Sequence, residues 1–164
     1  MQFSVGVEYS LHCLLYLVDV NERSVGIKDL AAYQGVSESY LSKFFAKLKK
    51  NGIVESVPGA KGGYRLARAP ETITFWDVVE AVEGSEPFFK CTEIRQNEII
   101  LDRSNLPASH TKSPCLIHKV MDEAEAQMKH FLQSKTLKWL YDEVQNKVPS
   151  VHIQATKEWF ERNL

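Results

Sequence analysis

Cys91 and Cys115 are the residues of this chain whose types and positions best suit metal or redox chemistry. They flank one irregular segment of 23 residues, and a long loop of this kind can bring its two ends together. Cys115 also lies near the predicted start of a long helix, where the helix dipole favours a thiolate. Two such thiolates can bind a metal ion, hold a cluster or oxidise to a disulfide, and two unrelated buried cysteines are the alternative. Cys13 lies in an apolar helical stripe and is predicted to be a core residue.

Glu8 and His12 form a second pair whose chemistry depends on their spacing. Residues four apart share a helix face, so this carboxylate and imidazole can ligate one iron or zinc ion. From the spacing alone, the simpler interpretation is a solvent-exposed pair worth about a few tenths of a kcal/mol. His118 follows Cys115 by three residues, and this spacing also lets both side chains face one metal ion.

The segment 37–50 is predicted to be a helix with two unlike faces. Apolar residues recur with helical spacing along one face: Leu41, Phe44, Phe45 and Leu48. The opposite face carries small and basic residues: Ser39, Lys43, Ala46 and Lys50. A helix with a packed back and a small, basic front is suited to the major groove of DNA.

The neighbouring segments place this helix in a winged helix-turn-helix. A short helix is predicted over 27–34, Gly35 provides the turn, and Ser37 is the expected N-cap of the second helix. Two strands joined by a glycine-rich turn follow over 53–66. The alternative, a winged helix that contacts only proteins, conflicts with the charge. Residues 37–68 carry seven Lys or Arg against two Glu, whereas the whole chain has a net charge of −1.

The predicted DNA contacts come from the start of this helix and from the hairpin. Ser39 and Lys43 are expected to read base edges, and Lys61 and Arg65 to bring the wing to phosphates or the minor groove. Gly62 and Gly63 would permit the backbone of the wing to approach the DNA closely. The full predicted set is Ser37, Ser39, Tyr40, Lys43, Lys47, Lys61, Gly62, Gly63, Tyr64 and Arg65. Lys47 is equally compatible with a solvated basic face.

The rest of the chain indicates a mainly α-helical protein with a small β-hairpin wing and a long dimerisation helix. A helix from Ser113-Pro114 to about Gln133 carries a long apolar seam, and pairing with its copy in a second chain would bury that seam. The expected organisation is a DNA-binding domain over 1–84, a sensor loop over 85–112, dimerisation helices over 113–148 and a C-terminal extension over 149–164. No apolar run has the length of a membrane span and no signal-type segment opens the chain, so a cytoplasmic protein is expected.

Several longer stretches carry a family resemblance. They are GVEYSLHC at 6–13, SESYLSKFFAKLKKNGIVESVPGAKGGYRL at 37–66, ITFWDVVEAVEG at 73–84, CTEIRQ at 91–96 and PCLIHKVMDEAEA at 114–126. In this combination the chain resembles the bacterial IscR/NsrR/RsrR-type family of winged-helix transcription regulators, and most closely its redox-sensing RsrR type. The resemblance implies a homodimer that binds operator DNA, acts as a repressor and senses through an iron–sulfur cluster.

The resemblance also implies a set of cluster ligands. Members of the family commonly use three loop cysteines; here Cys91 matches the first and Cys115 the last, while the middle one is absent. The RsrR type implies a [2Fe–2S] cluster held by these two cysteines and by Glu8 and His12 of the other subunit. Purified protein can have lost this cluster and be in the apo form. Nitrogen and oxygen ligands in place of thiolates raise the reduction potential. His118 is the alternative ligand, through its IscR-type spacing from Cys115.

Two rival functions remain at this point. One is a cluster-free regulator that switches by Cys91–Cys115 thiol oxidation, or by binding an enzyme partner through the acidic part of the chain after residue 68. The other is an enzyme, for which the sequence offers no phosphate loop and no Ser/His/Asp constellation.

Overall fold

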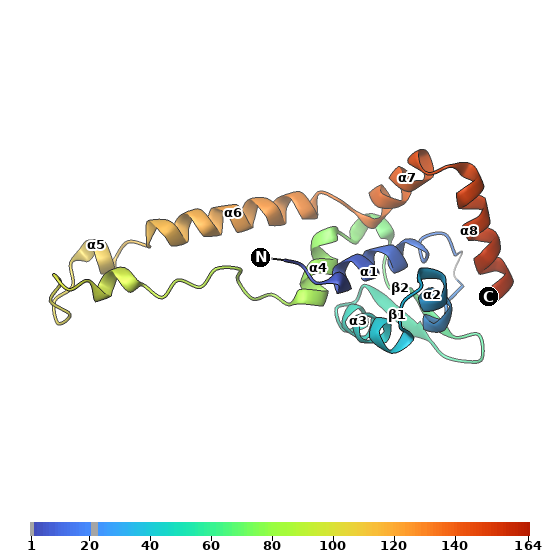
Figure 1. The fold of residues 1–164 in the computed structure, drawn as a ribbon, viewed down its shortest axis with the longest axis horizontal. Coiled ribbons are helices and arrows are strands. Elements are labelled where there is room, and N and C mark those ends of the chain that lie inside the picture. The colour runs from blue at the N-terminus through green and yellow to red at the C-terminus, as the bar shows by residue number, and fades with distance from the viewer. Residues whose placement is uncertain (1, 21–22) are drawn as a thin grey trace. The chain divides into compact units, whose positions relative to one another are not determined.

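A winged helix-turn-helix forms the larger part of the fold in the computed structural model, which describes residues 2–20 and 23–164 (Figure 1). Its elements are α1 (Val5–Leu15), α2 (Ile27–Gln34), α3 (Glu38–Lys50), β1 (Val54–Val57), β2 (Gly63–Leu66), the short 3-10 helix η1 (Pro70–Thr72) and α4 (Phe75–Glu83). The prediction of a mainly helical fold with a two-stranded wing is therefore confirmed.

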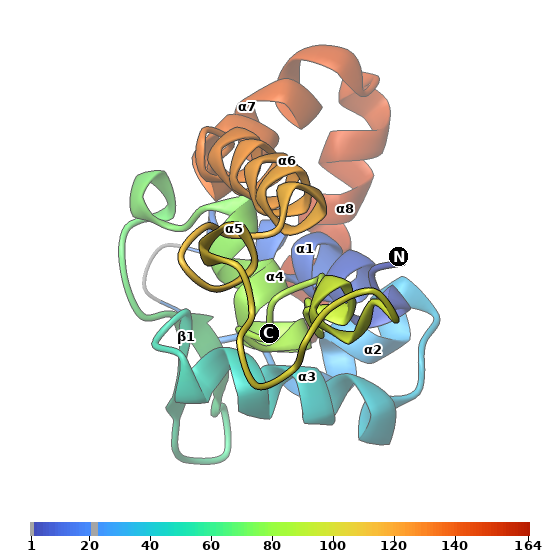
Figure 2. The ribbon, with the colours of Figure 1, turned by 90° about the vertical axis from the view of Figure 1, so that its left-hand side faces the viewer.

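The chain divides into two compact units: residues 2–85 with 132–164, and residues 86–131. The core of the first unit is built by fully buried side chains from α1, α2 and α3, among them Leu14, Leu30, Leu41, Phe45 and Leu48. Figure 2 shows α3 along one edge of this unit, with α1 and α4 on its inner side.

Local sequence signals explain where these helices begin and end. Gly35 ends α2 with a φ of 69°, a left-handed conformation that glycine adopts at little cost. The Ser37 hydroxyl accepts a hydrogen bond from the Tyr40 amide and caps α3. Thr74 and Asp77 form a reciprocal capping box at the start of α4, the structure that a Thr followed by Asp three positions later predicts.

The first helix is shorter than its apolar pattern suggests. Apolar residues over 5–20 predict one helix to Val20, but α1 ends at Leu15 and the chain continues in turns. The Tyr16 and Leu17 amides each donate to the carbonyl three residues earlier, which tightens the backbone and ends the α-helix. Leu17 nevertheless stays buried, so the apolar pattern predicts burial correctly and the helix end incorrectly.

Two further helices complete the first unit: α7 (Leu137–Lys147), capped by the Thr136 hydroxyl, and α8 (Ser150–Asn163). Phe160 of α8 is buried and its ring lies 4.9 Å from the ring of Tyr33 and 5.2 Å from that of Tyr16. The Tyr33 hydroxyl also meets the Thr156 hydroxyl at 2.7 Å. The C-terminal segment is thus packed on α2 and on the end of α1.

The second unit contains the 3-10 helix η2 (Ile94–Asn97), the one-turn helix α5 (Ala108–Thr111) and most of α6 (Leu116–Gln133). The helix expected from Ser113-Pro114 begins only at Leu116, because the Cys115 carbonyl accepts the first helical bond, from Lys119, and the Ser113 carbonyl is held by Arg95. Cys115 therefore lies at the N-cap instead of in the first turn.

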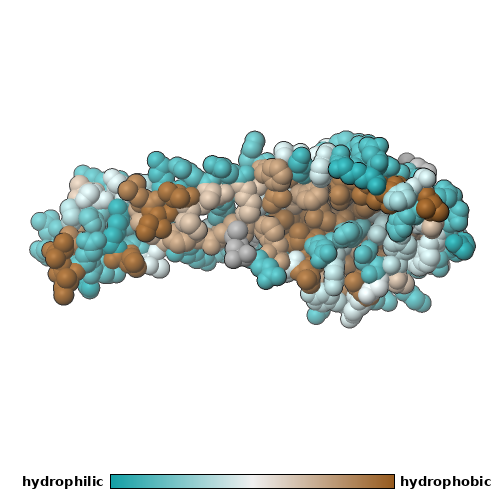
Figure 3. Space-filling view, turned by 45° about the horizontal axis from the view of Figure 1, so that its top comes forward, coloured by the Kyte–Doolittle hydropathy of each residue, from teal (hydrophilic) through white to brown (hydrophobic). Residues whose placement is uncertain are grey.

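Large apolar side chains stay on the surface of this second unit, as the brown patches of Figure 3 show. Leu116 is 77 % exposed, Ile117 66 % and Val120 62 %, all in the first two turns of α6. Among the described residues, no helix is both long and apolar enough to cross a membrane.

Candidate nucleic-acid interface and sensor site

The two faces of α3 differ as its sequence pattern predicts. The apolar face is buried: Leu41, Phe44, Phe45 and Leu48 are each at most 7 % exposed. The opposite face is exposed and carries Ser39, Lys43, Ala46 and Lys50. No bulky side chain projects from that face, so a helix in a groove could approach base edges closely.

The N-terminal turn of α3 offers hydroxyls and a helix N-terminus to a ligand. The hydroxyls of Ser37 and Ser39 lie 3.0 Å apart, and that of Ser37 also accepts from the Tyr40 amide at 3.4 Å. The Tyr40 ring packs edge-on against Phe44 at 4.9 Å and against Tyr9 at 6.1 Å. The helix dipole and free amides of this turn favour a phosphate.

The lysines of α3 point to different environments. Within residues 2–20 and 23–164, the exposed Lys43 makes no ion pair. The ammonium of Lys47 instead donates to the Val82 carbonyl at 2.6 Å, in the last turn of α4, and that of Lys49 donates to the Ser56 hydroxyl at 2.7 Å. Lys47 thus stabilises the C-terminal end of α4 in the free protein.

The two basic residues of the wing that are predicted to contact DNA, Lys61 and Arg65, have different surroundings. Lys61 lies exposed at the tip. Arg65 pairs with Glu55 directly across the hairpin, Nε to Oε1 at 2.5 Å, with both side chains nearly half exposed. A DNA phosphate would have to compete with this carboxylate for the guanidinium. Tyr64 is half-buried and its ring lies 4.9 Å from that of Phe45, so it fixes the wing to α3.

Gly62 and Gly63 of the wing lie so close to other backbone atoms of the same chain that neither position has room for a side chain. A Cβ atom on Gly62 would lie 2.4 Å from the Val57 carbonyl oxygen, and one on Gly63 would lie 2.3 Å from that of Val25. The backbone of Val25 pairs with that of Tyr64 beside this glycine. In the free protein, these glycines therefore allow two segments of the same chain to approach each other closely.

Cys91 and Cys115, which the sequence places at opposite ends of a long loop, lie together in the second unit. The Cys91 thiol lies close enough to the Cys115 sulfur to help lower the pKa of that group. Amide groups of His118 and Ile117 point at the same sulfur from the first turn of α6, and with Arg95 nearby they lower the pKa of Cys115 below its ordinary value. The predicted thiolate character of Cys115 thus has a structural basis. Cys13 is buried, which raises its pKa to about 12 and leaves it inert.

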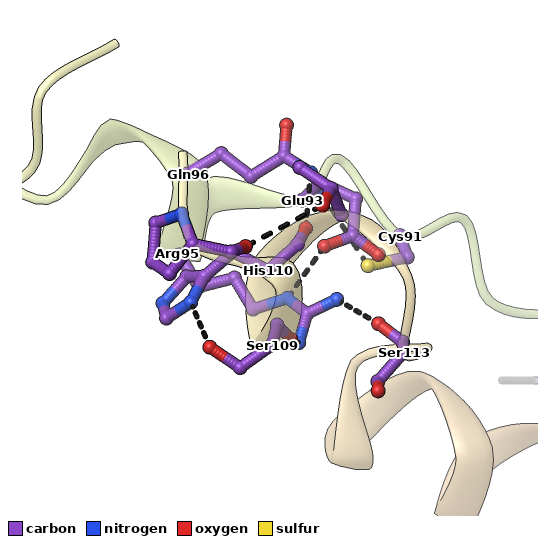
Figure 4. Close-up of polar contacts among 9 residues, drawn as sticks. Cys91, Glu93, Arg95, Gln96, Ser109, His110 and Ser113 are labelled. Carbon is purple, nitrogen blue, oxygen red and sulfur yellow. Dashed lines mark hydrogen bonds and ion pairs between the residues drawn. The ribbon is translucent and has the colours of Figure 1, made fainter. Parts of the chain in front are cut away.

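An arginine that the sequence pattern did not single out organises this loop (Figure 4). The Arg95 guanidinium binds Glu93 Oε2 at 2.7 Å, the Ser109 carbonyl at 3.0 Å and the Ser113 carbonyl at 2.5 Å. It therefore ties the segment that follows Cys91 to the segment that precedes Cys115. The signal in the sequence is weak: one Glu and one Arg two positions apart in an irregular segment.

Glu93 reinforces the same end of the loop. Its amide donates to the Cys91 sulfur at 3.4 Å, and its backbone is left-handed, with a φ of 52°, which is uncommon for a residue with a side chain. The neighbouring Arg95 guanidinium lowers the pKa of the Glu93 carboxyl. Gln96 adds a hydrogen bond to the His110 carbonyl at 2.7 Å.

His118 has one nitrogen satisfied and one free. Its Nε2 lies 3.1 Å from Asp122 Oδ2, whereas Nδ1 is buried and has no hydrogen-bond partner among the described residues. A carboxylate on one imidazole nitrogen and an open second nitrogen is the arrangement that metal-ligating histidines use.

Glu8 and His12 lie exposed on one face of α1, in the first unit. They border a groove of about 490 Å³ whose walls are mainly apolar and come from α1, α4 and α7, including Val5, Leu11, Phe75, Leu140 and Val144. Across the described part of the chain, no three Cys, His, Asp or Glu side chains stand together as a ready metal site.

Comparison with known proteins supplies an independent line of evidence. The family model described as "Rrf2: Iron-dependent Transcriptional regulator" matches residues 3–143. Protein rrf2 of Nitratidesulfovibrio vulgaris is 37 % identical over 138 residues, which cover 84 % of this chain and 85 % of that protein. The transcriptional regulator NsrR of Halalkalibacterium halodurans is 32 % identical over 139 residues, covering 84 % and 88 %. The solved structure of T. potens IscR has a TM-score of 0.65 at 25 % identity, covering 91 % of this chain and 93 % of its own.

Proposed function

Because this chain belongs to the Rrf2 family of transcription regulators, we propose that it binds operator DNA as a homodimeric repressor whose affinity is set by a redox-active [2Fe–2S] cluster. The family consists of transcription regulators, so the prediction that the chain is not an enzyme is confirmed. Its place of action is the cytoplasm, where the DNA lies. Residues 1–84 bind DNA, 85–112 sense, 113–148 dimerise and 149–164 extend the first unit.

DNA binding is supported by the exposed small and basic face of α3. Ser39 and Lys43 face outward from a helix whose other side is anchored by four buried side chains, and they reach base edges in the major groove. Ser37, Tyr40, Lys61 and Arg65 contact the sugar-phosphate backbone on either side. If the dimer makes about 6–10 phosphate contacts, its affinity falls about 10³–10⁵-fold between about 50 and 200 mM salt. Affinity for a selected DNA duplex that does not change with salt would contradict this mode of binding.

Dimer formation is supported by the uncovered apolar start of α6. Leu116, Ile117 and Val120 are each more than 60 % exposed, although burying such side chains is favourable by about 1.5–3 kcal/mol each. The same surface on a second copy would cover them in a two-fold symmetric contact. A dimer also presents two recognition helices to half-sites about one turn of DNA apart.

The residues present fit an iron–sulfur cluster in their chemistry. The two thiols lie near each other, and the pKa of Cys115 is lowered, which favours the thiolate that iron requires. We assign Cys91 and Cys115 as ligands from one subunit, and Glu8 and His12, which share an exposed face of α1, as ligands from the other. When bound, the cluster supplies a one-electron redox couple. The description of the matching family as iron-dependent supports the same proposal.

His118 is the alternative to His12 as the nitrogen ligand. Its Nδ1 is buried without a hydrogen-bond partner in the described part of the chain, and its amide already points at the Cys115 sulfur. Asp122 on Nε2 would hold the ring in the orientation and tautomer that leave Nδ1 free to ligate.

A cluster-free thiol switch is the second candidate function, because the two thiols lie near each other. Oxidation would join the Cys91 and Cys115 sulfurs in one disulfide, and an oxidant such as a peroxide would take up the two electrons and the two protons. In that case the cysteines would sense oxidants directly and no iron would be needed.

Anaerobic purification, with an absorption spectrum and an iron and sulfide count, separates these functions. We expect about two irons and two sulfides per cluster, with loss of visible absorbance in Cys91→Ser and Cys115→Ser. Glu8→Ala and His12→Ala should lose it as well, and His118→Ala should retain it; the reverse pattern would assign His118 as the ligand. Iron-free protein that forms the Cys91–Cys115 disulfide with peroxide would contradict the cluster proposal.

A further inference from the structure

A second cavity borders His12, one of the proposed cluster ligands. It has a volume of about 500 Å³ and lies within the first unit, between the end of α1, α7 and α8. Cavities of this size suit small organic ligands. More than half of its lining residues follow residue 143, where the family match ends.

The inner wall of the cavity is apolar. It is formed by side chains from all three helices: Leu15, Val144, Val148, Ile153 and Phe160. Phe160 is held in place by the rings of Tyr16 and Tyr33, so this wall is fixed by aromatic packing. An apolar ligand body would bury its surface here.

The Asp19 carboxylate connects the three helices that line the cavity, and its hydrogen-bond partners come from α7 and α8. Asp19 Oδ2 accepts a hydrogen bond from the Tyr141 hydroxyl at 2.8 Å and pairs with the Lys157 ammonium at 3.0 Å. This group connects the end of α1 to α7 and to α8. Because Lys157 is engaged here, it is not the cation that would receive an anionic ligand.

Arg23 is the cation that remains. It lies exposed at the border of the cavity, and among residues 2–20 and 23–164 its guanidinium makes no ion pair. A guanidinium binds a carboxylate through two parallel hydrogen bonds, more specifically than an ammonium can. Glu161 also borders the cavity and would repel a second acidic group on the ligand.

We propose that this cavity binds a small amphipathic monocarboxylic acid, with its apolar body against Val144, Val148 and Phe160 and its carboxylate on Arg23. The ligand would contact α1 and α8 at once. The first turn of α1 packs on α3, with Gly6 lying against the Phe44 ring. The inference requires neither the cluster nor the dimer.

Calorimetric titration of the full-length apo protein tests this site with octanoate and with 1-octanol, which has the same apolar body and no charge. We expect saturable binding of one octanoate per protomer, at least about tenfold tighter than 1-octanol, since hydrogen bonds between charged groups are the stronger kind. Arg23→Gln should reduce octanoate affinity to that of the alcohol and leave the alcohol unchanged. Arg162→Gln, on α8 but outside the cavity, is the matched control and should bind octanoate as wild type does.

A cavity-filling variant provides the second measurement. Val148→Trp should abolish binding of both probes while the far-ultraviolet circular dichroism stays that of a folded helical protein. Equal affinity for octanoate and 1-octanol, equal effects of the two arginine variants, or no saturable binding would each overturn the proposal.

Discussion

Lys43 and Lys47 lie one helical turn apart on α3, yet their ammonium groups have different environments. Lys43 is exposed and without an ion pair among the described residues, whereas Lys47 donates to the Val82 carbonyl of α4. A cation that is free in the unbound protein can meet a phosphate or a base edge without first breaking a contact. A cation that already stabilises a helix end loses that contact when it turns to DNA.

Substitution of these two lysines should therefore separate DNA affinity from stability. Lys43→Ala should weaken DNA binding by about 1–3 kcal/mol and relax discrimination between DNA sequences, with no change in urea midpoint. Lys47→Ala should lower the free energy of unfolding by about 1 kcal/mol, because it removes a hydrogen bond, and should change DNA affinity less. Fluorescence anisotropy on a selected duplex and urea titration measure the two effects. The opposite ranking in DNA affinity would show that Lys47 leaves Val82 to bind DNA.

The pKa of Cys115 predicts how its reactivity depends on pH. Amides of His118 and Ile117 stabilise the thiolate in the folded protein, so the folded pKa lies below that of the unfolded chain. The thiolate should therefore persist, and alkylation by iodoacetamide should continue, at a lower pH in the native apo protein than in guanidinium. Mass spectrometry of the peptide that carries Cys115 gives the rate at each pH. Coinciding pH profiles for native and unfolded protein would contradict the capped geometry.

At the scale of elements, α8 shows how a C-terminal extension becomes part of a DNA-binding unit. Phe160→Ala should lower the free energy of unfolding by about 3–5 kcal/mol, because the ring is buried between Tyr16 and Tyr33 and its loss leaves a cavity. Val151→Ala on the same helix is the control: this side chain is 76 % exposed, and a change within about 0.5 kcal/mol is expected. Urea unfolding followed by circular dichroism measures both. Similar small effects would mean that α8 is not packed on α2 in solution.

Elements with local signals could be predicted from the sequence, and those decided by distant partners could not. The cap at Ser37, the capping box at Thr74 and the turn at Gly35 act within four residues, so their types identify them. The start of α6 depends on Arg95, which lies 18 positions before the Ser113 carbonyl that it binds. No local pattern contains that contact.

The same distinction applies to the candidate site. The spacing of Cys91 and Cys115 suggests that a loop can bring them together, and the structure places the two thiols near each other. The clamp formed by Arg95 and Glu93 was missed, because hydrogen bonds to backbone carbonyls require no particular residue type at the other end. Charge and position alone predict that Lys47 and Tyr64 contact DNA. In the free protein, Lys47 donates to the Val82 carbonyl and the Tyr64 ring packs on Phe45.

At the scale of the whole molecule, charge and apolar surface are separated along the sequence. Residues 37–68 are basic, with a balance of +5, and residues 69–164 are acidic, with a balance of −4. DNA is therefore attracted to one part of the chain only. The exposed apolar residues at the start of α6 lie in the acidic part, so two copies can meet there without competing with DNA for a surface.

This separation predicts that dimerisation can be removed while the winged helix stays folded. The double substitution Leu116→Glu and Val120→Glu places charges one helical turn apart on the apolar face of α6, and burying them against a second copy would be strongly unfavourable. Sedimentation should then show a monomer with an unchanged helical spectrum. Its affinity for a duplex with two half-sites should fall to that for one half-site, because the second recognition helix is no longer attached. Val151→Glu, equally exposed but on α8, should remain dimeric. A double variant that stays dimeric would place the interface elsewhere on the chain.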